Sequence, residues 1–220
     1  MADLTLVVGN QNYSSWSMRP FLALRHTGAP FELVVVPLRQ SSTTASIASH
    51  SPAGRVPILH HGPLTVWDSL AICEYLAELF PDAKLWPADR AARAHARSIS
   101  AEMHSGFATL RNEMPMNVRA TKAPRPLGPD LAKDIERVKQ IWRDCRKQFG
   151  AGGPFLFGSF TNADAMFGAV VSRFRTYSVP LEGAEKAYAD AVWASPQMQA
   201  WAEEARKEAW GIDEYDKMQE

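Results

Sequence analysis

The strand-like patterns in this sequence end before residue 80, and this feature limits the fold more than any other. Short apolar runs rich in β-branched residues occupy residues 4–8, 31–36, 56–59 and 64–67. After a proline-bounded segment at residues 81–87, apolar residues recur only at helical spacing. The sequence therefore predicts an α/β unit over residues 1–80, a linker over residues 81–87 and an all-helical unit over residues 88–220.

The first unit alternates strands and helices in an order that determines how the strands pair. A helical pattern that stops at Gly28 follows the first strand, and Asp68 and Ser69 begin a second helix that Pro81 ends. Residues 41–51 are polar and predict a loop or a weak helix. Strands joined by a helix run parallel through a right-handed crossover, whereas the last two strands share a short turn and are antiparallel. This order, with a mixed four-stranded sheet, is that of the thioredoxin-like fold.

The second unit divides at its prolines and glycines into long helices. We predict helices over residues 89–115 and 130–149, a third that starts at Thr161 and a last one that starts at Ser195–Pro196. Thr161 and Asp164 have the spacing of a capping box, with Asp in place of the usual Glu.

Composition excludes several classes of partner. The chain of 220 residues balances 24 basic against 24 acidic residues, which gives no electrostatic reason to expect nucleic acid or an anionic membrane as a partner. No apolar run approaches the roughly 20 residues that span a bilayer. The two cysteines, Cys73 and Cys145, form no disulfide framework, and the histidines show no metal-ligand spacing. We therefore expect no metal and a reducing, cytoplasmic environment.

Three serines lie at the junction between the first predicted strand and the first predicted helix. Ser14, Ser15 and Ser17 precede Pro20, which places the helix start nearby because proline is tolerated in a first turn. Unpaired N–H groups and the helix dipole favour an anion at such a junction, and a thiolate is one such anion. The alternative is that Ser14 or Ser15 only caps the helix.

Few kinds of chemistry are possible at this junction. Redox proteins with this element order carry C-x-x-C in this loop, but here the loop contains no cysteine, so disulfide exchange is excluded there. Serine without an adjacent base is a weak nucleophile at neutral pH. The remaining possibility is that a serine donates a hydrogen bond to the thiolate of another molecule.

Four motifs carry a resemblance to a known family. The segments Tyr13–Pro20, Gly54–Leu59, Asp68–Ile72 and Thr161–Asp164 occur in the order and spacing of the cytosolic glutathione transferases, and the match covers essentially the whole chain. The serine loop most resembles that of the zeta class and its bacterial relatives, which include maleylacetoacetate isomerases. This chain has Trp16 where that loop has a cysteine, and Met18 where an aromatic residue follows.

The resemblance implies a glutathione site in the first unit. Ser14, supported by Ser15, would hold the glutathione thiolate. The Val56–Pro57 peptide would be cis and would present the Val56 backbone as an open strand edge for the cysteinyl residue of glutathione. Ser69 would bind the γ-glutamyl carboxylate and Asp68 its ammonium group, or Asp68 would only cap its helix. The implied glutathione-binding residues are Trp16, Arg55, Val56, Pro57, Asp68 and Ser69.

A second substrate, a small electrophile, would lie between the serine loop and the long helix of the second unit. The candidate residues for this electrophile pocket are Met103, His104, Phe107, Arg111, Met114 and Arg175. Met and Phe at these spacings are also typical of a core, and His104 is a candidate general base. Arg173 or Arg175 would bind an anionic substrate, or would lie on a solvated helix face or in an interdomain salt bridge.

The function implied is a glutathione transferase that activates the glutathione thiol for attack on a small electrophile, in the manner of detoxification enzymes. Glutathione would be the co-substrate, and the resemblance implies a homodimer. One alternative is a glutathione-dependent cis–trans isomerase of the maleylacetoacetate type. The other is a glutathione-binding adaptor without catalysis.

Overall fold

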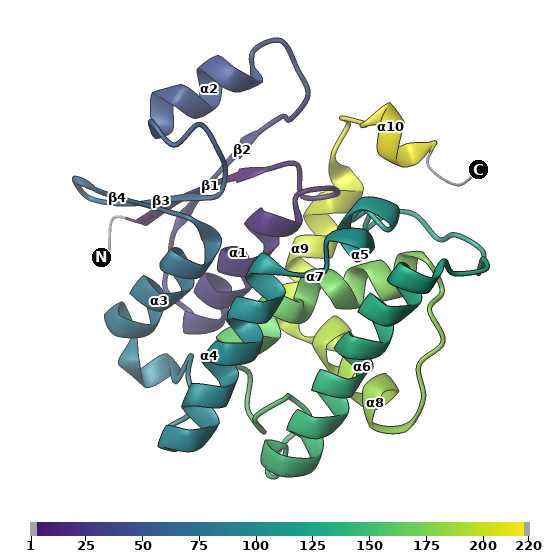
Figure 1. The fold of residues 1–220 in the computed structure, drawn as a ribbon. Helices are drawn as coiled ribbons and strands as arrows, with labels where there is room; N and C mark the ends of the chain where they lie inside the picture. Colours follow the sequence, from purple (N-terminus) through teal and green to yellow (C-terminus); the bar gives the residue numbers. More distant parts are fainter. Residues whose placement is uncertain (1–3, 218–220) are drawn as a thin grey trace.

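A mixed four-stranded sheet forms the first part of the chain, as the sequence predicts. The computed structural model describes residues 4–217, with strands β1 (Leu4–Gly9), β2 (Glu32–Val36), β3 (Ile58–His61) and β4 (Leu64–Trp67). Their order in the sheet is β2-β1-β3-β4. The strand β1 pairs parallel with β2 and antiparallel with β3, and β3 pairs antiparallel with β4 (Figure 1).

Helices α1 (Ser15–Thr27) and α3 (Ser69–Leu79) follow β1 and β4, and α2 (Thr43–His50) resolves the open choice at residues 41–51 as a helix. The start of α1 corrects the expectation for Pro20, which lies inside the helix rather than in its first turn. Pro20 cannot donate to the carbonyl of Trp16, four residues before it. The helix nevertheless begins at Ser15, because the side chain of Ser14 caps it and its inward face is buried from Met18 to Leu24.

The rest of the described chain is helical. After the short 3-10 turn η1 (Pro81–Ala83) come α4 (Arg90–Ser105), α5 (Ala108–Glu113), α6 (Pro129–Phe149), α7 (Asn162–Thr176), α8 (Gly183–Ala194), α9 (Pro196–Lys207) and α10 (Asp213–Asp216). The single helix expected over residues 89–115 is divided, because α4 ends at Ser105 and Phe107 takes a left-handed conformation with φ of 60°. Helix α8 was not predicted as a separate helix.

Helix α7 lies at the centre of the helical part and packs against α1, so the two parts of the chain share one apolar core (Figure 1). Gly168 permits a close approach: a Cβ atom there would lie 2.5 Å from Leu22 Cδ1 and 3.2 Å from Met198 Cε. This packing holds the start of α1 beside the last turns of α7. Within residues 4–217, no helix combines the length and the apolar character needed to cross a bilayer.

The predicted capping box at the start of α7 is confirmed. The carboxylate of Asp164 accepts hydrogen bonds from the Thr161 N–H at 2.8 Å, the Thr161 hydroxyl at 3.0 Å and the Leu156 N–H at 3.1 Å. Burial of Asp164 raises its pKa to about 6, although these donors favour the ionised form.

Asp164→Asn is expected to reveal this raised pKa as a pH-dependent loss of stability. A carboxyl whose pKa is higher in the folded state stabilises that state fully below its unfolded pKa, and loses this contribution as pH rises through the folded pKa. The difference in free energy of unfolding between wild type and variant should therefore be largest below about pH 4, should shrink as pH rises to about 6, and should stay level above that pH. Urea denaturation at a series of pH values measures it, and a difference that grows with pH would contradict the assignment.

Candidate functional site

The hydroxyl of Ser14 lies at the junction of β1 and α1, where it caps the helix and also borders two cavities. Its Oγ accepts a hydrogen bond from the Ser17 N–H at 3.4 Å and shares a 2.8 Å hydrogen bond with Ser17 Oγ. Ser17 Oγ in turn accepts from the Gly9 N–H at 3.0 Å. Capping and contact with a ligand are therefore compatible at Ser14.

The first cavity, about 820 Å³, lies beside the segment that precedes β3 and the start of α3. A volume of this size falls in the range of small-molecule sites. It is lined by Ser14, Leu38, Ile47, Ala53, Gly54, Trp67 and His104 together with Trp16, Arg55, Val56, Pro57, Asp68 and Ser69. The last six are the residues that the resemblance implies for glutathione, and the fold brings all of them to one cavity.

Two backbone features of this cavity suit a peptide-like ligand. The Val56–Pro57 peptide is cis, as expected. The N–H and C=O of Val56 make no hydrogen bond within the part of the chain that the structure describes. Ser69 is the first residue of α3, and Asp68 caps that helix by accepting from the Leu70 N–H at 2.8 Å.

Asp68 also faces His104 across the cavity, with 3.4 Å between Asp68 Oδ2 and His104 Nε2. Burial lowers the pKa of His104, and its two arginine neighbours act in the same direction, although Asp68 opposes them. The imidazole is therefore neutral near pH 7, and its contact with Asp68 is not a charge pair at that pH.

The second cavity, about 340 Å³, lies on the other side of Ser14 and Trp16, and the two cavities share these residues and Leu38. Its remaining lining comes from both parts of the chain: Tyr13, Ser15, Arg39, Arg111, Asn112, Pro115, Met116, Arg173, Ile212 and Tyr215. A group at Ser14 could thus contact ligands in both cavities.

Arg173 is the buried cation of the second cavity, with an exposed fraction of 4%. It donates to the Met114 carbonyl at 2.7 Å, to the Ala169 carbonyl at 3.2 Å and to Ser15 Oγ at 3.2 Å. All three acceptors are uncharged, so no carboxylate among residues 4–217 pairs with Arg173. Desolvation lowers its pKa to about 10, and the nearby charge of Arg111 adds to this effect.

Trp16 separates two more guanidinium groups. Arg19 lies 4.2 Å from the centre of its ring and Arg111 4.9 Å, so both make cation–π contacts. Arg19 is fully buried, and desolvation followed by the charges of Arg111 and Arg173 lowers its pKa to about 9. Its Nη1 donates to Ser69 Oγ at 3.4 Å, whereas Nε and Nη2 have no partner within residues 4–217. The region around the serine loop therefore carries three mutually repelling positive charges.

The remaining candidates for the electrophile pocket do not gather at these cavities. Met103, Phe107 and Met114 are buried in the apolar core and line neither cavity. Arg175 lies elsewhere, with its guanidinium over the ring of Trp193 at 4.4 Å. Two residues along a helix are about 200° apart around its axis, so Arg173 and Arg175 cannot face the same cavity. Of the two arginines, Arg173 takes the position beside the serines.

The C-terminal segment contributes to the site, and no sequence motif predicts this. The Glu208 carboxylate accepts from the N–H groups of Gln11 at 2.5 Å and Asn12 at 3.0 Å. Asp216 accepts from the Tyr13 hydroxyl at 2.8 Å. These contacts hold residues 208–216 beside the second cavity, where Ile212 and Tyr215 form part of the wall. No local sequence pattern predicts these hydrogen bonds, because they join residues about 200 positions apart.

No cluster of three or more His, Cys, Asp or Glu side chains suited to a metal ion occurs in residues 4–217. The two cysteines in this range are free and buried, and burial raises the pKa of each thiol to about 12. Neither is a thiolate at neutral pH. Any thiolate at Ser14 must therefore come from a ligand.

Comparison with known proteins agrees with this geometry. Residues 13–79 match the glutathione S-transferase N-terminal domain. The chain is 38% identical over 98 residues to a probable maleylacetoacetate isomerase of Caenorhabditis elegans, covering 44% of this chain and 45% of that protein. It is 30% identical over 158 residues to a zeta-class glutathione S-transferase of Euphorbia esula, covering 70% and 66%. The chain spans about half the length of the curated maleylacetoacetate isomerases that it matches.

A solved structure extends the similarity to nearly the whole chain. A glutathione transferase homolog from Burkholderia GL BGR1 with bound glutathione is 27% identical, with a TM-score of 0.69, and the match covers 93% of this chain and 98% of the other. The N-terminal domain match, the curated relatives and this full-length structural similarity agree. The chain belongs to the glutathione S-transferase family.

Proposed function

We propose that this protein is a glutathione transferase that activates the glutathione thiol at Ser14 for attack on a small, anionic electrophile. The observation that carries the proposal is the meeting of two cavities at Ser14 and Trp16. One cavity has an open backbone edge and a helix start. The other has Arg111 and Arg173, whose hydrogen bonds within residues 4–217 go only to uncharged acceptors. Two substrates bound there would meet at the Ser14 hydroxyl.

Glutathione would occupy the larger cavity as a peptide added to the edge of the sheet. The free N–H and C=O of Val56 would pair with the backbone of its cysteinyl residue. The N–H and hydroxyl of Ser69, at the start of α3, would receive the γ-glutamyl carboxylate, and the fully buried Arg19 behind Ser69 would strengthen this contact. Asp68 has one oxygen free of the Leu70 N–H to accept from the γ-glutamyl ammonium.

Ser14 would stabilise the thiolate by donating its hydroxyl hydrogen to the sulfur. In the structure the Ser14 hydroxyl donates to Ser17 Oγ at 2.8 Å. With a thiolate bound, the Ser14 hydroxyl would turn to the sulfur, and the rotatable Ser17 hydroxyl would donate to Ser14 Oγ instead. Lowering a thiol pKa from about 8.5 to about 6.5 needs roughly 2.7 kcal/mol. One charge-assisted hydrogen bond and the start of α1 can supply this amount. The thiol proton leaves to solvent. The sulfur lone pair then forms the C–S bond, and the leaving group, halide in a nitroaryl halide, departs with the electron pair of the bond that breaks.

The electrophile would carry a negative charge, because Arg173 and Arg111 line the second cavity without a carboxylate partner there. An anion would relieve their mutual repulsion and accept their hydrogen bonds. The same feature favours a second candidate, a glutathione-dependent cis–trans isomerase of the maleylacetoacetate type, which the curated relatives also suggest. In that reaction the thiolate adds to an activated double bond, rotation follows and glutathione leaves unchanged.

A three-part assay separates the candidates. We expect the protein to be retained on immobilised glutathione and to conjugate a nitroaryl halide, with one glutathione consumed per turnover. Isomerisation of maleylacetoacetate without consumption of glutathione would favour the isomerase. Retention without turnover of any electrophile would favour a binding or adaptor protein, and failure to bind glutathione at millimolar concentration would contradict the proposal.

We further propose a cytoplasmic homodimer that detoxifies electrophiles without engaging nucleic acid or membranes. Two buried free thiols suit a reducing compartment, and the balanced charge offers no electrostatic attraction to nucleic acid or anionic lipid. Sedimentation analysis at micromolar concentration tests the dimer.

A further inference from the structure

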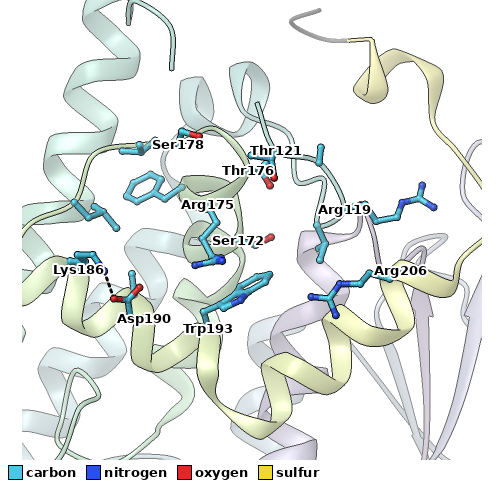
Figure 2. A pocket seen from close by; sticks show the side chains of 16 residues that line it. Arg119, Thr121, Ser172, Arg175, Thr176, Ser178, Lys186, Asp190, Trp193 and Arg206 are labelled. Carbon is cyan, nitrogen blue, oxygen red and sulfur yellow. Dashed lines mark hydrogen bonds and ion pairs between the residues drawn. The ribbon is translucent and has the colours of Figure 1, made fainter. Parts of the chain in front are cut away.

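A third cavity of about 740 Å³ lies on the far side of α7, and none of its lining residues borders either cavity at Ser14. It is formed by the segment at residues 118–121, the end of α7, the start of the loop that follows, and helices α8 and α9. Figure 2 shows Arg175, Ser172, Trp193 and Arg206 around this hollow.

The cavity has two cations that nothing in the described chain neutralises. Arg175 stacks on Trp193 at 4.4 Å, but its N–H groups have no hydrogen-bond or carboxylate partner within residues 4–217. The N–H groups of Arg206 likewise have no hydrogen-bond or carboxylate partner within residues 4–217. By contrast, the other acid–base pair at the cavity is already satisfied, because Lys186 donates to Asp190 at 2.5 Å (Figure 2). A stacked guanidinium keeps its edge free, and that edge fits a carboxylate with two parallel hydrogen bonds.

Ser172 is a second, independent sign of a ligand. Ser172 lines the cavity, the residue is 1% exposed, and its Oγ has no hydrogen-bond partner within residues 4–217. A buried hydroxyl without a partner is unfavourable, so a polar atom of a ligand at this position would stabilise it.

The other walls are apolar. Val118, Val179, Leu181 and Phe174 line the cavity beside Trp193. A bare inorganic anion would leave this surface unfilled, whereas a flat ring would cover it and could place its acid group between the two arginines. From these observations we infer that the cavity formed by Ser172, Arg175, Trp193 and Arg206 binds an aromatic carboxylate, separately from the glutathione site.

The test is calorimetric titration of the full chain with 2-naphthoate. Saturating S-hexylglutathione occupies the cavities at Ser14, so that the heat reports the third cavity. We expect one molecule to bind per chain. Arg175→Gln and Arg206→Gln should each weaken binding about tenfold or more, and Ser172→Ala should weaken it about threefold. The neutral analogue 2-naphthamide should bind at least tenfold more weakly than the acid.

The matched control is Arg90→Gln, which removes an exposed arginine of α4 that does not line the cavity. It should bind 2-naphthoate as wild type does. Because Arg175 and Arg206 are exposed, their variants should fold, and thermal unfolding verifies this. Equal affinity of wild type, Arg175→Gln and Arg206→Gln would overturn the inference, as would equal binding of acid and amide. Competition by inorganic phosphate at equal concentration would overturn the aromatic part. None of these outcomes depends on turnover of glutathione.

Discussion

Ser14→Ala is expected to raise the pKa of the bound glutathione thiol by one to two units, toward its free value near 8.5. Of the hydroxyls in residues 4–217, only that of Ser14 belongs to a residue that lines both cavities, and the variant removes it. A hydrogen bond to a charged group contributes about 1.5 to 3 kcal/mol, which corresponds to this shift. Ultraviolet absorbance of the thiolate against pH measures the pKa directly. Conjugation at pH 6.5 should fall about 5- to 50-fold, in proportion to the thiolate fraction.

Two controls separate catalysis from folding in this variant. Loss of the helix cap costs about 1 kcal/mol, so urea denaturation must show that Ser14→Ala is still folded under assay conditions. Ser15→Ala removes the neighbouring hydroxyl, which accepts from Arg173, and should leave the thiol titration within a few tenths of a unit. An unchanged titration in Ser14→Ala together with a shifted one in Ser15→Ala would transfer the role to Ser15.

Substitution of Arg111 or Arg173, the arginines that line the second cavity, is expected to give the second large effect. It should lower activity toward an anionic acceptor much more than activity toward a neutral one. Arg111→Gln and Arg173→Lys should each lower kcat/KM for the anionic acceptor 4-chloro-3,5-dinitrobenzoate by about 10- to 100-fold, because each removes or weakens a charge-assisted hydrogen bond. The neutral acceptor 1-chloro-2,4-dinitrobenzene should change by less than about threefold. Lysine keeps the charge of the buried Arg173 but cannot reach its three acceptors at once.

The comparison of two acceptors in each variant serves as an internal control for folding and for glutathione binding. Arg90→Gln, which removes an exposed arginine outside the site, should leave both acceptors unchanged. An equal loss for the charged and the neutral acceptor would mean that Arg173 only supports the structure. No loss for either would place the electrophile elsewhere.

Local sequence signals predicted the parts of the site that depend on neighbouring residues. The parallel pairing of the first two strands, the antiparallel pairing of the last two, the caps at Asp68 and Thr161 and the cis peptide at Val56–Pro57 agree with the structure. Each follows from short motifs, whether read directly or through the family resemblance.

The parts that failed depend on tertiary packing. Pro20 indicated a helix start, but burial of α1 against α7 and the cap at Ser14 outweigh the cost of a proline inside the helix. An error of two residues in the register of α7 would put Arg175 in the place of Arg173. Which arginine faces the serines depends on how α7 packs, and the sequence pattern does not give this packing. The contacts of Glu208 and Asp216 with the serine loop span almost the whole chain, so no local pattern reveals them.

The most direct test of the central claim is a crystal structure of the protein with glutathione. We predict the glutathione sulfur within hydrogen-bonding distance of Ser14 Oγ, its cysteinyl backbone paired with Val56 and its γ-glutamyl carboxylate at Ser69. Glutathione found elsewhere, or a sulfur directed away from the second cavity and out of reach of Ser14, would contradict the account.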